Sequence, residues 1–101
     1  MASRLELQIL LEDILGSHNV YFQPPASIEM HYPAIVYSRS NIVNEHANDE
    51  VYMQNKSYEI TVIDEDPDGE IVDRISRLPH CQFDRHFKSD NLNHDVFTLY
   101  F

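Results

Sequence analysis

The sequence has only one cysteine and two glycines among its 101 residues. A single cysteine, Cys81, cannot close a disulfide within the chain, so the expected setting is a reducing cytosol. Two glycines are too few for a loop that cradles phosphates, and neither G-x-G-x-x-G nor G-x-x-x-x-G-K-[ST] occurs. The sequence therefore excludes a nucleotide site built on a glycine-rich loop.

Basic residues are also scarce. Seven lysines and arginines stand against seventeen acidic residues, which gives a formal net charge of −10 at pH 7. A small chain with this charge repels phosphates and cannot release counterions from DNA by binding them. A protein that reads nucleic-acid sequence is not expected.

A long hydrophobic run is missing as well. The N-terminal stretch has one cation, Arg4, and its apolar residues are interrupted by Glu6, Gln8, Glu12 and Asp13. This pattern predicts neither a signal peptide nor a membrane span, so we expect a soluble protein with no membrane partner.

The length and composition predict one small domain over residues 1–101. A hydrophobic content of 43% supports a core, but a domain of this size buries only about 60 to 65% of the surface of its unfolded chain. Apolar surface is therefore expected to find cover in an oligomer.

Helical periodicity is clearest at the start of the chain. Apolar residues recur there at the spacing of one helical face, namely Leu7, Leu10, Leu11, Ile14 and Leu15. The pattern predicts a helix over Arg4–Leu15, with Ser3 and Glu6 as a capping box and Gly16 as a left-handed C-terminal cap.

The part of the chain after this helix is predicted to be mostly extended. Three prolines make residues 16–33 an extended connector. Residues 34–37 predict a short strand, followed by a polar segment, 38–50, that is a long loop or an extended hairpin tip. Alternation over residues 57–62 predicts a half-buried strand, with a partner strand around 51–53.

The last third predicts a helix and two strands. Asp66 and Pro67 are typical of a helix start, and Pro79 of its end, with Ile71, Val72, Ile75 and Leu78 on one face. Residues 81–87 and 95–101 predict strands joined by a turn over 89–93. The fold class is therefore α+β, a small single domain with a mostly antiparallel or mixed sheet packed against two helices.

One acidic segment resembles a metal loop. Residues 64–69 match the first six positions of an EF-hand calcium loop, but the twelfth position holds Ile75 instead of a bidentate carboxylate. We favour the other interpretation, in which these acids cap and complement the following helix.

Histidines and Cys81 do not form a recognisable site. The chain has six histidines, and none shows a paired zinc-ligand spacing. His80 beside Cys81, and His94 beside Asp95, point to opposite faces if they lie in strands, so neither pair makes an activated nucleophile. We therefore expect no enzyme, no catalytic or metal-binding residue and no cofactor.

Three stretches of the sequence resemble small neck and tail-completion proteins of tailed bacteriophages. They are residues 58–73 (YEITVIDEDPDGEIVD), residues 78–101, which end in DNLNHDVFTLYF, and the shorter YPAIVY at 32–37. The order of helix, strands, helix and strands is also similar to that of the tail-terminator and head-to-tail joining proteins of long-tailed phages.

The resemblance implies a structural virion protein of the neck or tail, assembled in the host cytoplasm. Such proteins form a ring, expected here to be a hexamer, that caps the tail tube, meets the neck proteins on the head side and lets genomic DNA pass. An acidic ring suits that passage, since it repels DNA.

Six residues are candidates for interaction surfaces: Glu45, Asp49 and Glu50 in the polar segment, and Phe97, Leu99 and Phe101 in the last strand, whose two faces are both apolar. Two alternatives remain open, namely another neck, minor capsid or head-closure protein, and a small acidic binding module that depends on calcium or mimics DNA.

Overall fold

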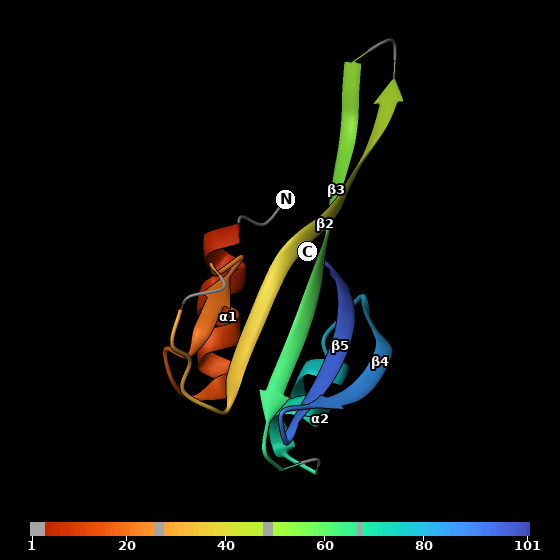
Figure 1. Cartoon of the computed structure of the whole chain (residues 1–101). Helices are drawn as coiled ribbons and strands as arrows, with labels where there is room; N and C mark the ends of the chain where they lie inside the picture. The colour runs from red at the N-terminus through yellow and green to blue at the C-terminus, as the bar shows by residue number, and fades with distance from the viewer. Residues whose placement is uncertain (1–3, 26–27, 48–49, 67) are drawn as a thin grey trace.

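The computed structural model describes residues 4–25, 28–47, 50–66 and 68–101. The chain order of the described elements is α1 (Arg4–Leu15), β1 (Val20–Phe22), β2 (Ala34–Ala47), β3 (Glu50–Asp64), α2 (Glu70–Ser76), β4 (Cys81–Ser89) and β5 (Leu92–Tyr100). Figure 1 shows how they are arranged in space.

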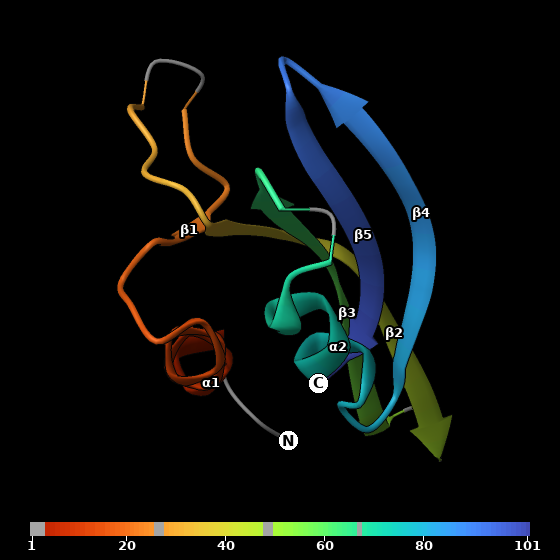
Figure 2. The same ribbon diagram turned by 90° about the horizontal axis from the view of Figure 1, so that it is seen from below.

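All five strands belong to one mixed sheet in the order β1-β2-β3-β5-β4. β1 runs parallel to β2, and every other neighbouring pair is antiparallel. Both helices lie on the same side of this curved sheet (Figure 2). The molecule is thus a small α+β domain, which confirms the fold class predicted from the sequence.

The core lies between the helices and one face of the sheet. Alternate strand residues face it because side chains along a strand point to opposite sides. The residues of this cluster that are at most 1% exposed are Leu7, Leu11, Ile35, Tyr37, Tyr58, Ile60, Val62, Ile75, Phe97 and Leu99.

The first helix has the bounds that its periodicity predicts. Leu7 and Leu11 are fully buried, and Leu10, Ile14 and Leu15 pack against the core. Gly16 ends the helix with φ +78°, and its amide donates to the Glu12 carbonyl at 2.8 Å. Glycine adopts this left-handed backbone without a steric penalty, so the predicted C-terminal cap is confirmed. Ser3 lies outside the described residues.

Polar contacts fix α1 to the edge of the sheet. The buried Tyr37 hydroxyl donates to Gln8 Oε1 at 2.5 Å and accepts from Arg4 Nη1 at 3.4 Å. Gln8 Nε2 in turn donates to the Val20 carbonyl at 3.1 Å. Burial raises the pKa of the Tyr37 phenol, because the anion would lose its hydration.

Two predictions of local structure are corrected, and for a third the structure decides between two alternatives. Residues 16–33 are not only a connector, since they contain β1. Residues 51–53 are not a partner of 58–62, because both lie in the continuous strand β3 and its partners are β2 and β5. For the polar segment 38–50 the hairpin alternative holds over the described residues, because residues 38–47 extend β2 and Glu50 begins β3.

The start of α2 also differs from the prediction. The helix begins at Glu70 with Gly69 as its N-cap, not at Asp66 and Pro67. Asp64 Oδ1 accepts the Asp66 amide at 3.1 Å and Asp66 Oδ1 accepts the Asp68 amide at 2.9 Å. Such local turns compete with helix formation and delay its start. Pro67 lies outside the described residues.

The β4–β5 hairpin closes in two residues. Ser89 pairs with Leu92, and between them Asp90 and Asn91 have φ +52° and +64°. Positive φ at both central positions is the backbone of a type I′ turn, which asparagine and aspartate tolerate. The predicted turn is confirmed, and it is tighter than the 89–93 segment that the sequence indicates.

Candidate interaction site: the arm and the outer strand

The β2–β3 hairpin extends well beyond the rest of the sheet (Figure 1). We call its projecting part, residues 41–47 and 50–56, the arm. β1 pairs with β2 only at residues 35–37, and β5 ends opposite Ser57 at Tyr100. Within the described chain no further strand pairs with either side of the arm, and the molecule measures 52 × 27 × 23 Å.

A β-bulge marks the base of the arm. Arg39 pairs with Tyr58 and Asn41 with Ser57, so Ser40 is an extra residue in β2. The Ser40 and Ser57 hydroxyls lie 2.8 Å apart and share a hydrogen bond, which satisfies the buried Ser57. Bulges bend and twist a strand locally. The hairpin thus changes course where it leaves the helix-covered part.

The arm contains two of the candidate interaction residues. Glu45 lies in β2 and Glu50 in β3, whereas Asp49 lies outside the described residues. Over residues 41–56 the sequence has these three acids and one cation, Lys56, at the base of the arm. The predicted interaction segment is therefore an acidic strand pair that projects from the domain.

The outer strand, β4, forms the opposite edge of the sheet. All of its residues except Cys81 are exposed, including Phe83 at 56% and Phe87 at 41%. Arg85 Nη1 contacts Asp84 Oδ2 at 2.5 Å, and Arg85 Nη2 lies 3.7 Å from Glu59 Oε1. No ion pair of Lys88 is found within the described chain, so β4 carries a free cation beside two exposed aromatic rings.

A register shift between Phe83 and Arg85 puts the two aromatic residues on opposite faces of the sheet. Phe83 meets Phe97 edge-on at 5.6 Å on the helix side, and Phe87 stacks on His94 at 4.6 Å on the other side. β4 was not among the interaction surfaces predicted from the sequence. Polar residues on both faces of a strand are the signal that marks such an edge.

The candidate residues of the last strand lie in the core. Phe97 is fully buried and Leu99 is 1% exposed, both on the helix-covered face. Phe101 packs against the core, and its amide donates to the Lys56 carbonyl at 3.0 Å. The prediction that Phe97 and Leu99 meet a neighbour is therefore corrected, because the helices of the same chain cover them.

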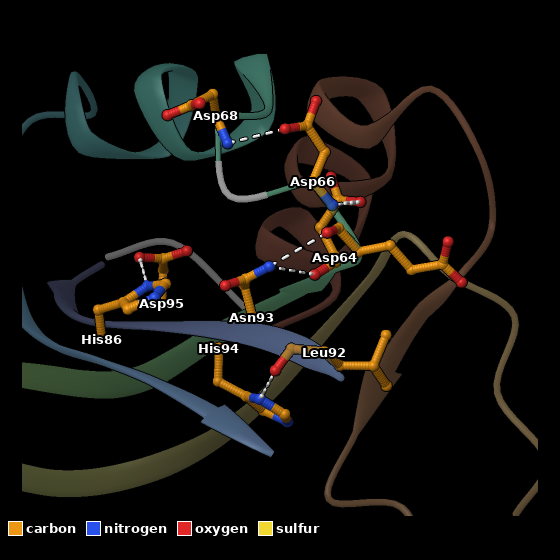
Figure 3. A network of polar contacts seen from close by, with 9 residues as sticks. Asp64, Asp66, Asp68, His86, Leu92, Asn93, His94 and Asp95 are labelled. Carbon is orange, nitrogen blue, oxygen red and sulfur yellow. Dashed lines mark hydrogen bonds and ion pairs between the residues drawn. The ribbon is translucent and has the colours of Figure 1, made fainter. Parts of the chain in front are cut away.

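The acidic loop after β3 has a structural role (Figure 3). Its first two aspartates accept hydrogen bonds from backbone amides of the same loop. Asn93 Nδ2 donates to the carbonyls of Asp64 at 3.4 Å and Glu65 at 3.1 Å. Ile75, at the twelfth position of the calcium motif, is fully buried. Within the described ranges no three acidic, histidine or cysteine side chains lie where they could hold a metal ion.

The histidines of the last hairpin separate as the strand geometry predicts. His86 Nδ1 lies 2.7 Å from Asp95 Oδ1 on the helix side, whereas His94 lies on the opposite face and contacts the Leu92 carbonyl through Nδ1 at 3.1 Å (Figure 3). His94 and Asp95 thus do not act together.

Cys81 is not placed as a nucleophile. The thiol packs against the core, and burial raises its pKa, which keeps it protonated. His80, beside it, is exposed in a turn with φ +61°.

Comparison with known proteins adds no family to this geometry. Neither a scan against models of protein families nor a search of curated proteins gives a match for this chain. Within the residues that the structure describes, no helix is long and apolar enough to span a bilayer.

Proposed function

We propose that the chain is a structural virion subunit of a tailed bacteriophage. In this proposal it is a tail terminator or head-tail joining protein that assembles as a ring on the tail tube, contacts the neck proteins on the head side and lets genomic DNA pass. The resemblance in residues 58–73 and 78–101 suggests this class, and the geometry supplies an element suited to assembly.

The arm is the observation that carries the proposal. It lengthens the chain along one axis without adding to the helix-covered core, and no strand of the described residues lies beside its two outer edges. Unpaired strand edges favour pairing with another chain. An element of this kind is therefore better suited to docking than to stabilising its own domain.

The charge supports the same role. Six copies of a chain with a formal charge of −10 would together carry −60. DNA that moves past such a ring meets repulsion and makes few of the phosphate contacts that would hold it. An acidic subunit therefore suits a passage through which DNA slides.

The test uses tail tubes from a phage whose genome carries this sequence. The purified chain is mixed with tubes that lack their terminal ring, and tube ends are imaged by electron microscopy while light scattering gives the mass of the free protein. Rings on tube ends, followed by joining to filled heads, are expected. A matched variant with a shortened arm should leave the ends bare.

Two results would overturn the proposal. One is a chain that never joins tubes and restores no infectious particles. The other is a monomer whose stability rises with millimolar calcium, which would favour the acidic binding module instead.

A further inference from the structure

Two exposed surfaces lie on opposite sides of the domain, one on α1 and the other on β4 (Figure 2). We propose that the outer face of α1 in one copy packs against the helix side of β4 in the next copy. This inference rests on the proposed ring and names the contact that would build it.

The outer face of α1 consists of Leu5, Ile9 and Asp13, which recur every four residues and therefore lie above one another on the helix. This face points away from the buried Leu7 and Leu11. Leu5 is 62% and Ile9 68% exposed, and Asp13 is exposed as well. α1 thus presents to solvent a short apolar stripe with an acidic group at its end.

The helix side of β4 is formed by three residues whose partners alternate along β5, namely Phe83, His86 and Lys88. Phe83 is 56% exposed, the His86 side chain is 42% exposed, and Lys88 is exposed. The described part of the chain therefore leaves this side of the outer strand largely open. A third helix placed here would extend the layer formed by α1 and α2.

The two surfaces carry opposite charges. Neither Asp13 nor Lys88 has an ion pair within the residues that the structure describes. Complementary charges at an interface favour the correct partner and the correct orientation. Two β4 strands paired about a two-fold axis would instead place Arg85, the central residue of the strand, opposite itself, and would leave Leu5 and Ile9 uncovered.

The strand registers place both surfaces at the same height along the sheet. Phe83 lies in one row of paired residues with Tyr37 of β2. The Tyr37 hydroxyl contacts Arg4 and Gln8, which belong to the first half of α1. Copies related by rotation about an axis along the strands keep these heights, so β4 of one copy meets α1 of the next at the same level.

Direction fits as well. β2 runs into the arm, and because β2, β3, β5 and β4 alternate in direction, β4 runs away from it. α1 also runs away from the arm (Figure 1). Rotation keeps both directions, so the start of α1 faces the start of β4. An interface that joins two different surfaces in this way closes into a ring when the rotation is right.

The spacing of the side chains matches along this contact. From Leu5 to Asp13 the helix rises about 12 Å, since each residue adds about 1.5 Å. From Phe83 to Lys88 the ladder advances four positions, from the partner Phe97 to the partner Asn93, which is about 14 Å. Leu5 can therefore pack on Phe83 while Asp13 reaches Lys88.

The first test exchanges the charges of the predicted pair. Asp13→Lys and Lys88→Glu each create a like-charge contact, so each alone should weaken self-association about tenfold. The double variant restores opposite charges and should associate within about threefold of the wild type. Sedimentation velocity over a concentration series gives the association constant, and circular dichroism checks the fold.

Arg85→Glu is the matched control for Lys88→Glu. It makes the same change of charge in the same strand but on the other face of the sheet, so it should change association by less than about threefold. Stronger association of Arg85→Glu, together with no effect of Asp13→Lys, would favour β4 against β4 and overturn the contact with α1.

The second test removes the apolar contact. Ile9→Gln should weaken self-association at least about tenfold, because buried apolar side chains contribute most of the energy of an interface. Ile28→Gln makes the same substitution at an exposed isoleucine outside both surfaces and should change it less than about twofold. Equal effects of the two variants would contradict the contact.

The third test locates the contact directly. Asp13→Cys and Lys88→Cys are made separately in a Cys81→Ser background, and a short bis-maleimide is added to each variant and to their mixture. Linked dimers are expected in the mixture only, since the proposed contact joins position 13 of one copy to position 88 of another. Linkage of Lys88→Cys alone would show that two β4 strands meet.

The outcomes separate this inference from the ring itself. Rings that form equally well with Ile9→Gln and Asp13→Lys would overturn the contact between α1 and β4 and leave the ring in place. A wild-type chain that neither self-associates nor occupies tube ends would overturn both. If the wild type assembles only on tubes, occupancy of tube ends by each variant replaces sedimentation as the readout.

Discussion

The two antiparallel hairpins of the sheet end in different ways. β4–β5 closes at once in the two-residue turn Asp90–Asn91, and β5 lies between two strands from Asn93 to Leu99. β2–β3 is longer, and beyond the bulge at Ser40 it extends past both the helices and the other strands. The first hairpin lies wholly within the domain. About half of the second hairpin projects from the domain, and no described strand lies beside that half.

This difference separates stability from assembly. Burial of apolar side chains is the main favourable term in folding. The described residues of the core cluster come from α1, β1, α2, β5 and the parts of β2 and β3 outside the arm. Changes in that region should therefore alter the free energy of unfolding, and changes in the arm should alter association.

The largest effect is expected for Phe97→Ala. The side chain is fully buried, so its loss should cost about 3–5 kcal/mol in the free energy of unfolding. Urea denaturation followed by circular dichroism measures this value. Phe87→Ala in the same hairpin removes a 41% exposed ring and should cost less than about 1 kcal/mol. Similar losses for the two variants would mean that the helices do not define the core face.

A smaller effect is expected for Tyr37→Phe, which tests the part of β2 below the arm. Loss of the hydroxyl removes a hydrogen bond to Gln8 and should cost about 1–2 kcal/mol at pH 7. Because burial raises the pKa of Tyr37 in the fold, its contribution is present below the unfolded pKa and is lost as the pH rises through the folded one.

Alkaline denaturation checks that sign. Wild-type stability should fall above about pH 10, the ordinary tyrosine range, and Tyr37→Phe should lose less over the same interval. An equal fall in both proteins would assign the effect to other tyrosines.

The tight turn should respond by about 1 kcal/mol. Asn91→Ala puts a residue that disfavours positive φ at φ +64°, whereas Asn91→Gly keeps that backbone accessible. Thermal unfolding of the two variants gives the difference. A glycine variant that is the less stable of the two would argue against the type I′ turn.

The smallest change in stability is expected from shortening the arm. Val43 pairs with Asn55, so replacing residues 44–54 by Asn-Gly closes a two-residue hairpin at that pair. The free energy of unfolding should move by less than about 1 kcal/mol, since none of the core residues that the structure describes is removed and the closed loop is shorter. Occupancy of tube ends should be lost. A loss of several kcal/mol would show that the arm belongs to the folding unit.

Much of the fold follows from periodicity in the sequence. The bounds of α1 and the strand within residues 57–62 were predictable because one face of each is apolar and buried. The final hairpin was predictable because turn residues separate two runs of strand-forming residues. β1 was not, since a three-residue strand with parallel pairing has too few residues to show alternation. For the arm, the sequence did not distinguish a loop from a hairpin. No helix covers the arm, so its strands need no apolar face.

The interaction residues were harder to predict. Both faces of β5 are apolar in the sequence, and only the position of the helices shows that Phe97 and Leu99 point inward. The free edges of β4 and the arm depend on strand order, which no local pattern gives. Glu45 and Glu50 were identified by charge alone, and they lie in the element that leaves the domain.

The arm also gives the molecule a direction. It emerges from one end of the sheet only, so copies arranged around a single axis would all point it the same way. Such an assembly would have two different ends although it contains one kind of subunit. The acid-rich hairpins would lie at one of these ends. An assembly with two different ends can bind one partner at one end and a different partner at the other.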